Sequence, residues 1–380
     1  MDEGVRARSN PSSRRRIEPL VTKRLVTILG TRPEIVKFSP LLPRFDERFE
    51  HVLIHTGQHY DENMDAVFFD ELRLARPRHS LGVGSAGGPG AQTGRMLERL
   101  EPLLIEERPA WVVVLGDTNS TLAGALVAAK LGIPVAHVEA GCRSFNRTTP
   151  EEQNRVVVDH LADVLFAPDV DAVHHLRAEG IAEGRIHEVG NTGLDATRRT
   201  MAFAGAERLE RFGVTPDAFV VATVHRAENT DDAARLAGLM NALAEIARRI
   251  PLLFPMHPRT SAALTRHGIA VPPEVRMLPP LGNLDFLALL RFGMFSLSDS
   301  GGVQEEAAVV NRPCLILRGE TEWIRLVDAG KNILAGTQTA AIVGAANRLI
   351  DSADIRDTIR RKPAPLNFGA TDRIVAFLER

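Results

Sequence analysis

Short apolar runs alternate with amphipathic stretches along almost the whole chain, and this alternation allows few folds. The apolar runs have the length of buried strands, while Thr121–Leu131 and Gln153–Leu161 have helical spacing. We therefore expect an α/β protein whose parallel sheets are covered by helices on both faces. The expected strands are Leu25–Leu29, Val52–His55, Val112–Leu115, Val135–Glu139 and Val164–Ala167, followed by Phe219–Val224, Leu252–Met256, Val275–Leu278, Met294–Leu297 and Leu315–Leu317.

The chain has 380 residues, which is enough for two domains with separate cores. The pattern restarts at Phe219 after the segment Gly190–Asp195, so we expect a first domain over residues 21–190 and a second from residue 191. Residues 1–20 are polar and rich in Arg, Ser and Pro, which predicts a disordered basic tail. Ligands of parallel sheets bind at the carboxyl ends of the strands, so two such domains predict a cleft between them.

Composition excludes several classes of function. A net charge of −2 and a pI near 6.7 provide no basic field for nucleic acid. No apolar run has the length of a membrane span, so no membrane partner is expected. The two cysteines, Cys142 and Cys314, are too few for a disulfide framework or a cysteine-based zinc site. They fit a reducing cytoplasm, where we expect the protein.

Charged residues follow the expected strands of the first domain. Arg32 lies in the loop after the first strand and Lys37 one turn into the next helix, where both can face a ligand anion; solvated surface charges are the alternative. Asp117 follows Val112–Leu115, where a helix cap and an active-site carboxylate are equally open. Glu139 ends an apolar strand. A carboxylate there is costly unless it is paired or functional, and we expect a function.

Two adjacent glutamates open the helix that begins near Thr149. Thr149 suits the N-cap, Pro150 suits the first helical position, and Glu152 completes a capping box. Glu152 therefore has a structural explanation, whereas Glu151 has none. We expect Glu151 to be the site residue of the pair.

In the second domain, the segment Asp299–Ala307 reads DSGGVQEEA and joins a strand to a helix. Gly301 and Gly302 free the backbone, so the helix N-terminal N–H groups and the Ser300 hydroxyl predict a diphosphate site without a Walker lysine. Glu306, one turn further along, can reach ribose hydroxyls. Favourable charge near a helix N-terminus is the alternative for this glutamate.

Histidines follow two strands of the second domain. His225 is either a cleft residue or a structural histidine, and His257 is expected to contact phosphate. His55 and His59 are four residues apart but lack the glutamate of an HExxH motif, so we expect no metal. The segment 82–87 has the spelling of a dinucleotide fingerprint, but we expect it outside a strand-to-helix turn and therefore expect no nicotinamide cofactor.

Taken together, the motifs resemble one family. GTRPE with the later lysine, HTGQH, GDT, HVEAG, PEExNR, HRxEN, MHPRT and DSGGVQEE occur in the order seen in the non-hydrolysing UDP-N-acetylglucosamine 2-epimerases, from about Arg24 onward. The resemblance implies two Rossmann-like, doubly wound domains facing across a cleft, as in glycosyltransferase-B folds. It also implies that a second domain over 191–366 binds UDP, that helix 367–380 packs back on the first domain, and that the enzyme is a homodimer.

The resemblance assigns residues to roles. It implies a catalytic constellation in which Asp117, Glu139, Glu151 and His225 carry the chemistry and Arg32 and Lys37 bind the substrate, and it implies that Ser300, Gly301 and Glu306 hold UDP. We also expect Arg143, His257 and Gly302 to bind the substrate, and we expect no cofactor and no metal. The chain departs from the family after DSGG, where Trp323 stands in place of a common arginine that would neutralise phosphate. Arg325 is a candidate substitute for that arginine.

The expected reaction is reversible inversion of C2 in UDP-N-acetylglucosamine, giving UDP-N-acetylmannosamine. The hydrogen on C2 is not acidic until the anomeric oxygen leaves, so departure of UDP through a 2-acetamidoglucal intermediate solves the chemical problem. Three alternatives stay open: a hydrolysing 2-epimerase that releases UDP and N-acetylmannosamine, a 2-epimerase of a modified UDP-amino sugar such as a diacetamido uronic acid, and a glycosyltransferase of the same architecture.

Overall fold

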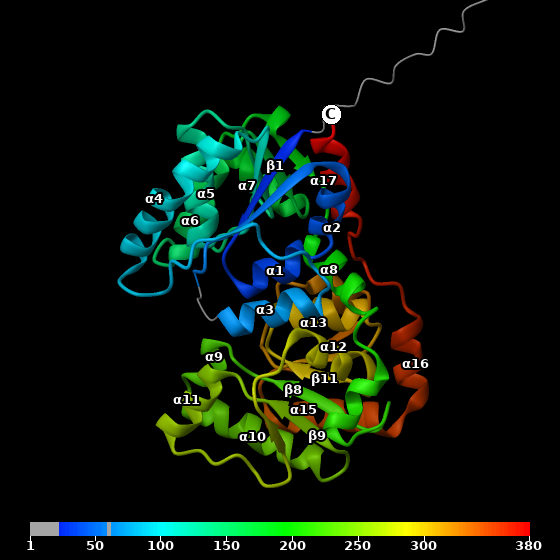
Figure 1. The fold of residues 1–380 in the computed structure, drawn as a ribbon. Helices are drawn as coiled ribbons and strands as arrows, with labels where there is room; N and C mark the ends of the chain where they lie inside the picture. The colour runs from blue at the N-terminus through cyan, green and yellow to red at the C-terminus, as the bar shows by residue number, and fades with distance from the viewer. Residues whose placement is uncertain (1–22, 59–61) are drawn as a thin grey trace, which may run out of the picture.

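The structure is a computed structural model that describes residues 23–58 and 62–380, without the side chains of residues 62–66. The tail expected over residues 1–20 and the residue His59 lie outside the described residues. Two parallel sheets with flanking helices form the molecule, one above the other in Figure 1. The expectation of an α/β fold with two parallel sheets is confirmed.

The first sheet has seven strands in the order β3-β2-β1-β4-β5-β6-β7, all parallel. Its strands are β1 Arg24–Leu29, β2 Glu50–His55, β3 His79–Ser80, β4 Trp111–Leu115, β5 Val135–Val138, β6 Val164–Ala167 and β7 Ile186–Glu188. Its helices are α1 Arg32–Phe38, α2 Leu41–Arg48, α3 Glu62–Glu71, α4 Pro89–Glu107, α5 Asn119–Lys130, α6 Pro150–Leu161 and α7 Val170–Ala178, with the 3₁₀ helix η1 Glu183–Arg185.

The second sheet has six parallel strands in the order β10-β9-β8-β11-β12-β13. Its strands are β8 Val220–Thr223, β9 Leu252–Pro255, β10 Arg276–Leu278, β11 Ser296–Ser298, β12 Cys314–Ile316 and β13 Asn332–Leu334. Around it lie η2 Ala206–Phe212 and the helices α9 Ala227–Thr230, α10 Ala233–Ala247, α11 Pro258–His267, α12 Asn283–Phe292, α13 Gly301–Val309, α14 Ile324–Asp328, α15 Thr339–Asp351 and α16 Ala353–Arg361.

Alternation along the strands builds a core on each face of each sheet. In β1, Val26 and Ile28 join the cluster under α4 and α5, whereas Leu25 and Leu29 join the cluster on the opposite face. The second sheet is likewise covered by two buried clusters. Successive side chains of a strand point to opposite faces, so strands buried on both sides appear as continuous apolar runs.

Two helices connect the halves of the molecule. Helix α8, Thr192–Thr200, contacts α1 of the first half and α13 of the second. Helix α17, Ala370–Leu378, buries Ile374 and Val375 in the core of the first sheet and packs on α2 and α8 (Figure 1). The domain limits at 190/191 and 366/367 remain our proposal. In the described part of the chain, no helix is both long and apolar enough to cross a membrane.

The structure changes two local expectations. Strand β5 ends at Val138, because Glu139 has a φ of 63°, in the left-handed region that a strand cannot contain. The segment 82–87 does connect a strand to a helix, namely the two-residue β3 to α4, so our expectation that it lies outside such a connection is wrong. The strand was missed because two residues carry no alternation signal.

Candidate active site

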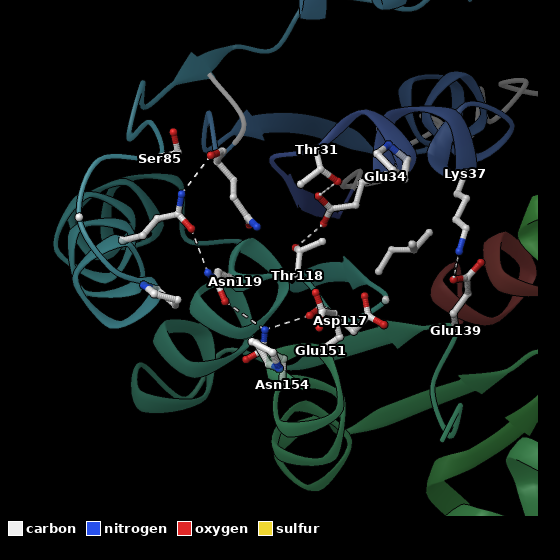
Figure 2. A pocket seen from close by; sticks show the side chains of 18 residues that line it. Thr31, Glu34, Lys37, Ser85, Asp117, Thr118, Asn119, Glu139, Glu151 and Asn154 are labelled. Atoms are coloured by element: carbon white, nitrogen blue, oxygen red, sulfur yellow. Dashed lines mark hydrogen bonds and ion pairs between the residues drawn. The ribbon is translucent and has the colours of Figure 1, made fainter. Parts of the chain in front are cut away.

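A cavity of about 460 Å³ lies at the carboxyl ends of the first sheet's strands; we call it the first-domain cavity. The loops after β1, β4 and β5 and the start of α6 line it, since parallel strands deliver their loops to one edge. Figure 2 shows side chains converging here from segments far apart in the sequence. Its charged lining residues are Glu34, Lys37, Asp117, Glu139 and Glu151.

A second cavity, of about 610 Å³, lies between the two halves; we call it the interdomain cavity. Helices α1 and α8 line it from one side, and α12, α13 and the residue Trp323 line it from the other. Lys37 and Glu139 line both cavities, so the two spaces meet at this pair. The charged residues of the interdomain cavity are Arg32, Lys37, Glu139, Asp169, Glu305 and Glu306.

Lys37 and Glu139 form an ion pair at the junction of the two cavities. The Lys37 Nζ lies 2.5 Å from Glu139 Oε2 (Figure 2). The Thr192 hydroxyl donates to Glu139 Oε1 at 3.1 Å. Burial alone would lower the pKa of Lys37, but the charge and hydrogen bond of Glu139 outweigh it and raise that pKa. The pair thus places the Lys37 ammonium and the Glu139 carboxyl group side by side where the two cavities meet.

Glu34 is a site residue that the sequence analysis did not single out. Its side chain is only 2% exposed, yet it lines the first-domain cavity. Its Oε2 accepts from the Gly30 N–H and the Thr31 hydroxyl, and its Oε1 accepts from the Thr118 and Thr121 hydroxyls. Burial raises its pKa despite these bonds. Glu34 therefore holds the loop after β1 against the loop that carries Asp117.

Asp117 and Glu151 line the same cavity, where the sequence analysis placed them together. Asp117 pairs with Arg155, and its carbonyl accepts from the Asn154 amide at 2.9 Å. Glu151 is exposed at the first turn of α6. The expected capping box is wrong. Thr149 makes no side-chain cap, and Glu152 instead accepts from the backbone N–H groups of residues 144 and 145, so its role is structural by another route.

The predicted diphosphate site is the N-terminus of α13. Ser300 is its N-cap residue and makes no side-chain cap bond, and Gly302 and Glu306 line the interdomain cavity. Burial raises the pKa of Glu306 to about 7. Glu305, which we did not predict, accepts from the Asn191 amide at 3.0 Å, and burial together with the charge of Glu139 raises its pKa to about 8. Its position facing Glu139 depends on tertiary structure, which leaves no signal in sequence.

His225 and His257 come together but line neither cavity. Their rings lie 4.8 Å apart at 30°. The backbone N–H of His225 donates to Asp299 at 3.0 Å, and its ring lies 3.9 Å from the same carboxylate. Burial lowers the pKa of His225, although Asp299 opposes the shift. The His257 ring accepts from the Arg259 N–H at 3.2 Å and so caps α11.

Arg143 lies in a network of buried ion pairs, away from both cavities. Its side chain is 1% exposed and lies 2.7 Å from Asp159 and 2.6 Å from Glu179. It lines neither cavity, because these two carboxylates take up its guanidinium. The expected substrate-binding role of Arg143 stays a prediction, and we propose a structural role for this residue instead. Among the described residues, no group of three or more His, Cys, Asp or Glu side chains is arranged to hold a metal ion.

The chain is similar to known proteins over most of its length. The model of the family UDP-N-acetylglucosamine 2-epimerase matches residues 44–379. A Methanococcus maripaludis protein named UDP-N-acetylglucosamine 2-epimerase is 43% identical over 86% of this chain and 91% of its own. A Pseudomonas aeruginosa protein named UDP-2,3-diacetamido-2,3-dideoxy-D-glucuronate 2-epimerase is 41% identical over 85% and 91%. The Methanocaldococcus jannaschii UDP-GlcNAc 2-epimerase, solved with UDP-GlcNAc and UDP, superposes with a TM-score of 0.77 at 42% identity, covering 93% of this chain and 99% of that one.

Proposed function

Since the chain belongs to the UDP-N-acetylglucosamine 2-epimerase family, we propose that it interconverts UDP-N-acetylglucosamine and UDP-N-acetylmannosamine. UDP leaves C1 and the C2 proton is removed, which gives 2-acetamidoglucal. Re-addition of UDP with protonation of the opposite face gives the epimer. This route needs cations on the leaving diphosphate and carboxylates beside the sugar.

One observation carries the proposal: the Lys37–Glu139 pair lies where the first-domain cavity meets the interdomain cavity. The interdomain cavity holds the N-terminus of α13, which suits the diphosphate. The first-domain cavity holds the carboxylates, which suit the sugar ring. The scissile C1–O bond then falls at the pair, so an ammonium faces the departing oxygen and a carboxylate faces the ring.

The remaining roles follow from position. We assign Asp117, Glu139 and Glu151 to proton transfer and to stabilising positive charge on the ring. Arg32, Ser300, Gly301, Gly302 and Glu306 are assigned to UDP. His225 and His257 stand outside both cavities, so we retain them only as diphosphate contacts that require movement of the second domain.

The relatives act on two kinds of sugar by name, and the charge of the first-domain cavity favours one. Its lining carries one ammonium, on Lys37, against four carboxyl groups, on Glu34, Asp117, Glu139 and Glu151. A uronic acid would add another carboxylate to this surface without a partner, which costs free energy. We therefore propose a neutral N-acetylated sugar rather than a diacetamido uronic acid.

Nuclear magnetic resonance in heavy water tests the reaction. With UDP-N-acetylglucosamine, we expect both UDP-linked epimers to appear with deuterium at C2, and UDP not to accumulate. Accumulation of free N-acetylmannosamine and UDP would instead identify a hydrolysing enzyme. Epimer without deuterium would rule out removal of the C2 proton to solvent.

We also propose a homodimer and a cytoplasmic location. The dimer is supported by the family resemblance, and sedimentation velocity tests it. The location is supported by the free thiols of Cys142 and Cys314 in the described structure. Cell fractionation tests the location.

A further inference from the structure

Gly301, the first residue of α13, is enclosed by two side chains of the second half. A Cβ at this position would lie 3.2 Å from Trp323 Nε1 and 3.6 Å from Arg226 Nη2. Its φ is not in the left-handed region, so glycine is needed here for space and not for backbone freedom. The indole N–H and the guanidinium therefore sit directly against the helix N-terminus.

Several hydrogen-bond donors lie together at the N-terminus of α13, and few acceptors lie beside them. The N-cap Ser300 provides no side-chain acceptor for the first-turn N–H groups of this nine-residue helix. Within residues 23–58 and 62–380, the buried Nε of Arg226 has no hydrogen-bond partner, and the half-buried Trp323 places its indole N–H 3.2 Å from a Cβ at Gly301. Donors gathered at the positive end of a helix favour the binding of an anion there.

The charge at this point comes from Arg226 and not from Arg325. An indole donates one hydrogen bond but carries no charge, so Trp323 alone cannot neutralise a phosphate. Arg226 lies 4.0 Å from Glu322, but Arg318 holds that carboxylate more closely, at 2.6 Å. Neither arginine lines the interdomain cavity, but Arg226 Nη2 lies 3.6 Å from a Cβ placed at Gly301, whereas Arg325 is exposed and lines a separate cavity of about 80 Å³.

We propose that Trp323 and Arg226 together bind the diphosphate of the nucleotide sugar at the N-terminus of α13. The indole N–H donates a hydrogen bond to a phosphate oxygen, and the guanidinium supplies the charge that an arginine at position 323 would supply. This assignment rests on the proposed function, because it takes the ligand to be a UDP-sugar. The residue at position 323 then affects the affinity for UDP more than the affinity for the sugar.

Calorimetric titration with UDP tests the assignment directly. Trp323→Phe keeps an aromatic ring and removes the donor, so we expect the Kd for UDP to rise about tenfold, and Arg226→Gln to raise it tenfold or more. Trp323→Arg should restore binding in the Arg226→Gln background, because it returns the charge to the same place. Arg325→Gln removes the same charge two residues away and should leave Kd unchanged.

Fluorescence gives an independent readout. Trp111 and Trp323 are the only tryptophans, so Trp111→Phe leaves Trp323 as the sole reporter, and UDP should change its emission. Unchanged Kd values for Trp323→Phe and Arg226→Gln, in enzyme that still epimerises, would overturn this assignment and leave the proposed function intact. Failure of the unmodified enzyme to bind UDP would overturn both.

Discussion

At the scale of single residues, Glu139 is the most constrained group of the site. Its φ of 63° is unfavourable for a non-glycine residue, and the backbone holds it at the end of β5 between Lys37 and Thr192. Backbone strain of this kind persists where the surrounding structure fixes it, and it gathers at functional sites. The strain turns the carboxylate out of the sheet and toward the junction of the two cavities.

Neutralising a proposed catalytic carboxylate should stop the chemistry without unfolding the protein. We expect Glu139→Gln and Glu151→Gln each to lower kcat by about 10²–10⁴-fold, the range associated with acid–base groups. Glu151 is exposed and Gln has the same size, so the melting temperature of Glu151→Gln should stay within about 2 °C. A kcat near that of the parent in either variant would remove that residue from the mechanism.

A second residue-scale prediction concerns pH. Burial and the facing Glu139 raise the pKa of Glu305 to about 8, with Asp169 and Glu306 adding to the shift and Lys37 opposing it. The protonated carboxyl of Glu305 therefore favours the folded state. This contribution to stability is complete below the pKa of the same group in the unfolded chain, and it is lost as the pH rises through about 8. The unliganded enzyme should therefore lose stability between about pH 5 and pH 8.

Glu305→Gln removes this titration and should flatten the decline. We expect the fall in melting temperature from pH 6 to pH 9 to be smaller in the variant by about 3 °C or more, measured by calorimetry. Glu188→Gln, an exposed carboxylate on β7, is the matched control. Parallel curves for the parent and Glu305→Gln would show that Glu305 is ionised throughout this range.

At the scale of elements, a buried ionic network fixes the segment between β5 and α6. Asp159 on α6 is fully buried and accepts from Arg143, from the His137 ring and from the Gly141 N–H. Glu179, after α7, completes the pairing of Arg143. The network joins β5, α6 and α7 behind the carboxylates Glu139 and Glu151, so it positions them without touching the cavities.

Removing one member of this network should unfold the protein more easily. Truncation of Arg143 leaves the Asp159 charge buried, which typically costs about 3–5 kcal/mol. We expect Arg143→Ala to lose about 3 kcal/mol of unfolding free energy in urea, while the exposed Arg147→Ala loses less than about 0.5 kcal/mol. Full stability of Arg143→Ala with weakened substrate binding would return Arg143 to the substrate-binding residues.

At the scale of the whole molecule, the C-terminal segment returns from the second half to the first. Asp195 on α8 accepts from the Gly369 and Thr371 N–H groups and from the Thr371 hydroxyl, all near 2.9 Å. These bonds begin α17, whose Ile374 and Val375 then fill the core of the first sheet. The same helix α8 holds Glu139 through Thr192, so the attachment of α17 and the catalytic edge share one element.

Asp195→Ala should therefore loosen the C-terminal helix before the rest of the molecule. Three hydrogen bonds to a buried carboxylate are lost, and we expect a loss of about 3 kcal/mol. Hydrogen exchange should rise first in residues 370–378. The exposed Asp372→Ala is the control on the same helix. Exchange that rises uniformly over both domains would show that Asp195 has no particular link to α17.

Strands that are buried on both faces could be predicted from their own residues, whereas a very short strand and the end of a strand could not. The expected strand Val164–Ala167 coincides with β6, and Leu25–Leu29 differs from β1 by one residue, since runs buried on both faces stand out from their helical neighbours. The two-residue β3 was missed because its pairing with β2 depends on the neighbouring strand and not on its own residues. The left-handed backbone of Glu139 was also missed, because no residue pattern in the sequence shows where a strand ends.

The sequence by itself determined the α/β class and placed Asp117, Glu139 and Glu151 at the ends of strands or the start of a helix. These properties depend on residues close together in the chain, because the periodicities of strands and helices can be recognised over a few turns or residues. Tertiary structure alone decided that Arg143 is held by Asp159, that Glu305 faces Glu139, and that Arg226 lies beside Trp323. Each of these depends on distant segments meeting, and the charge of a side chain does not specify which partner the fold will bring to it.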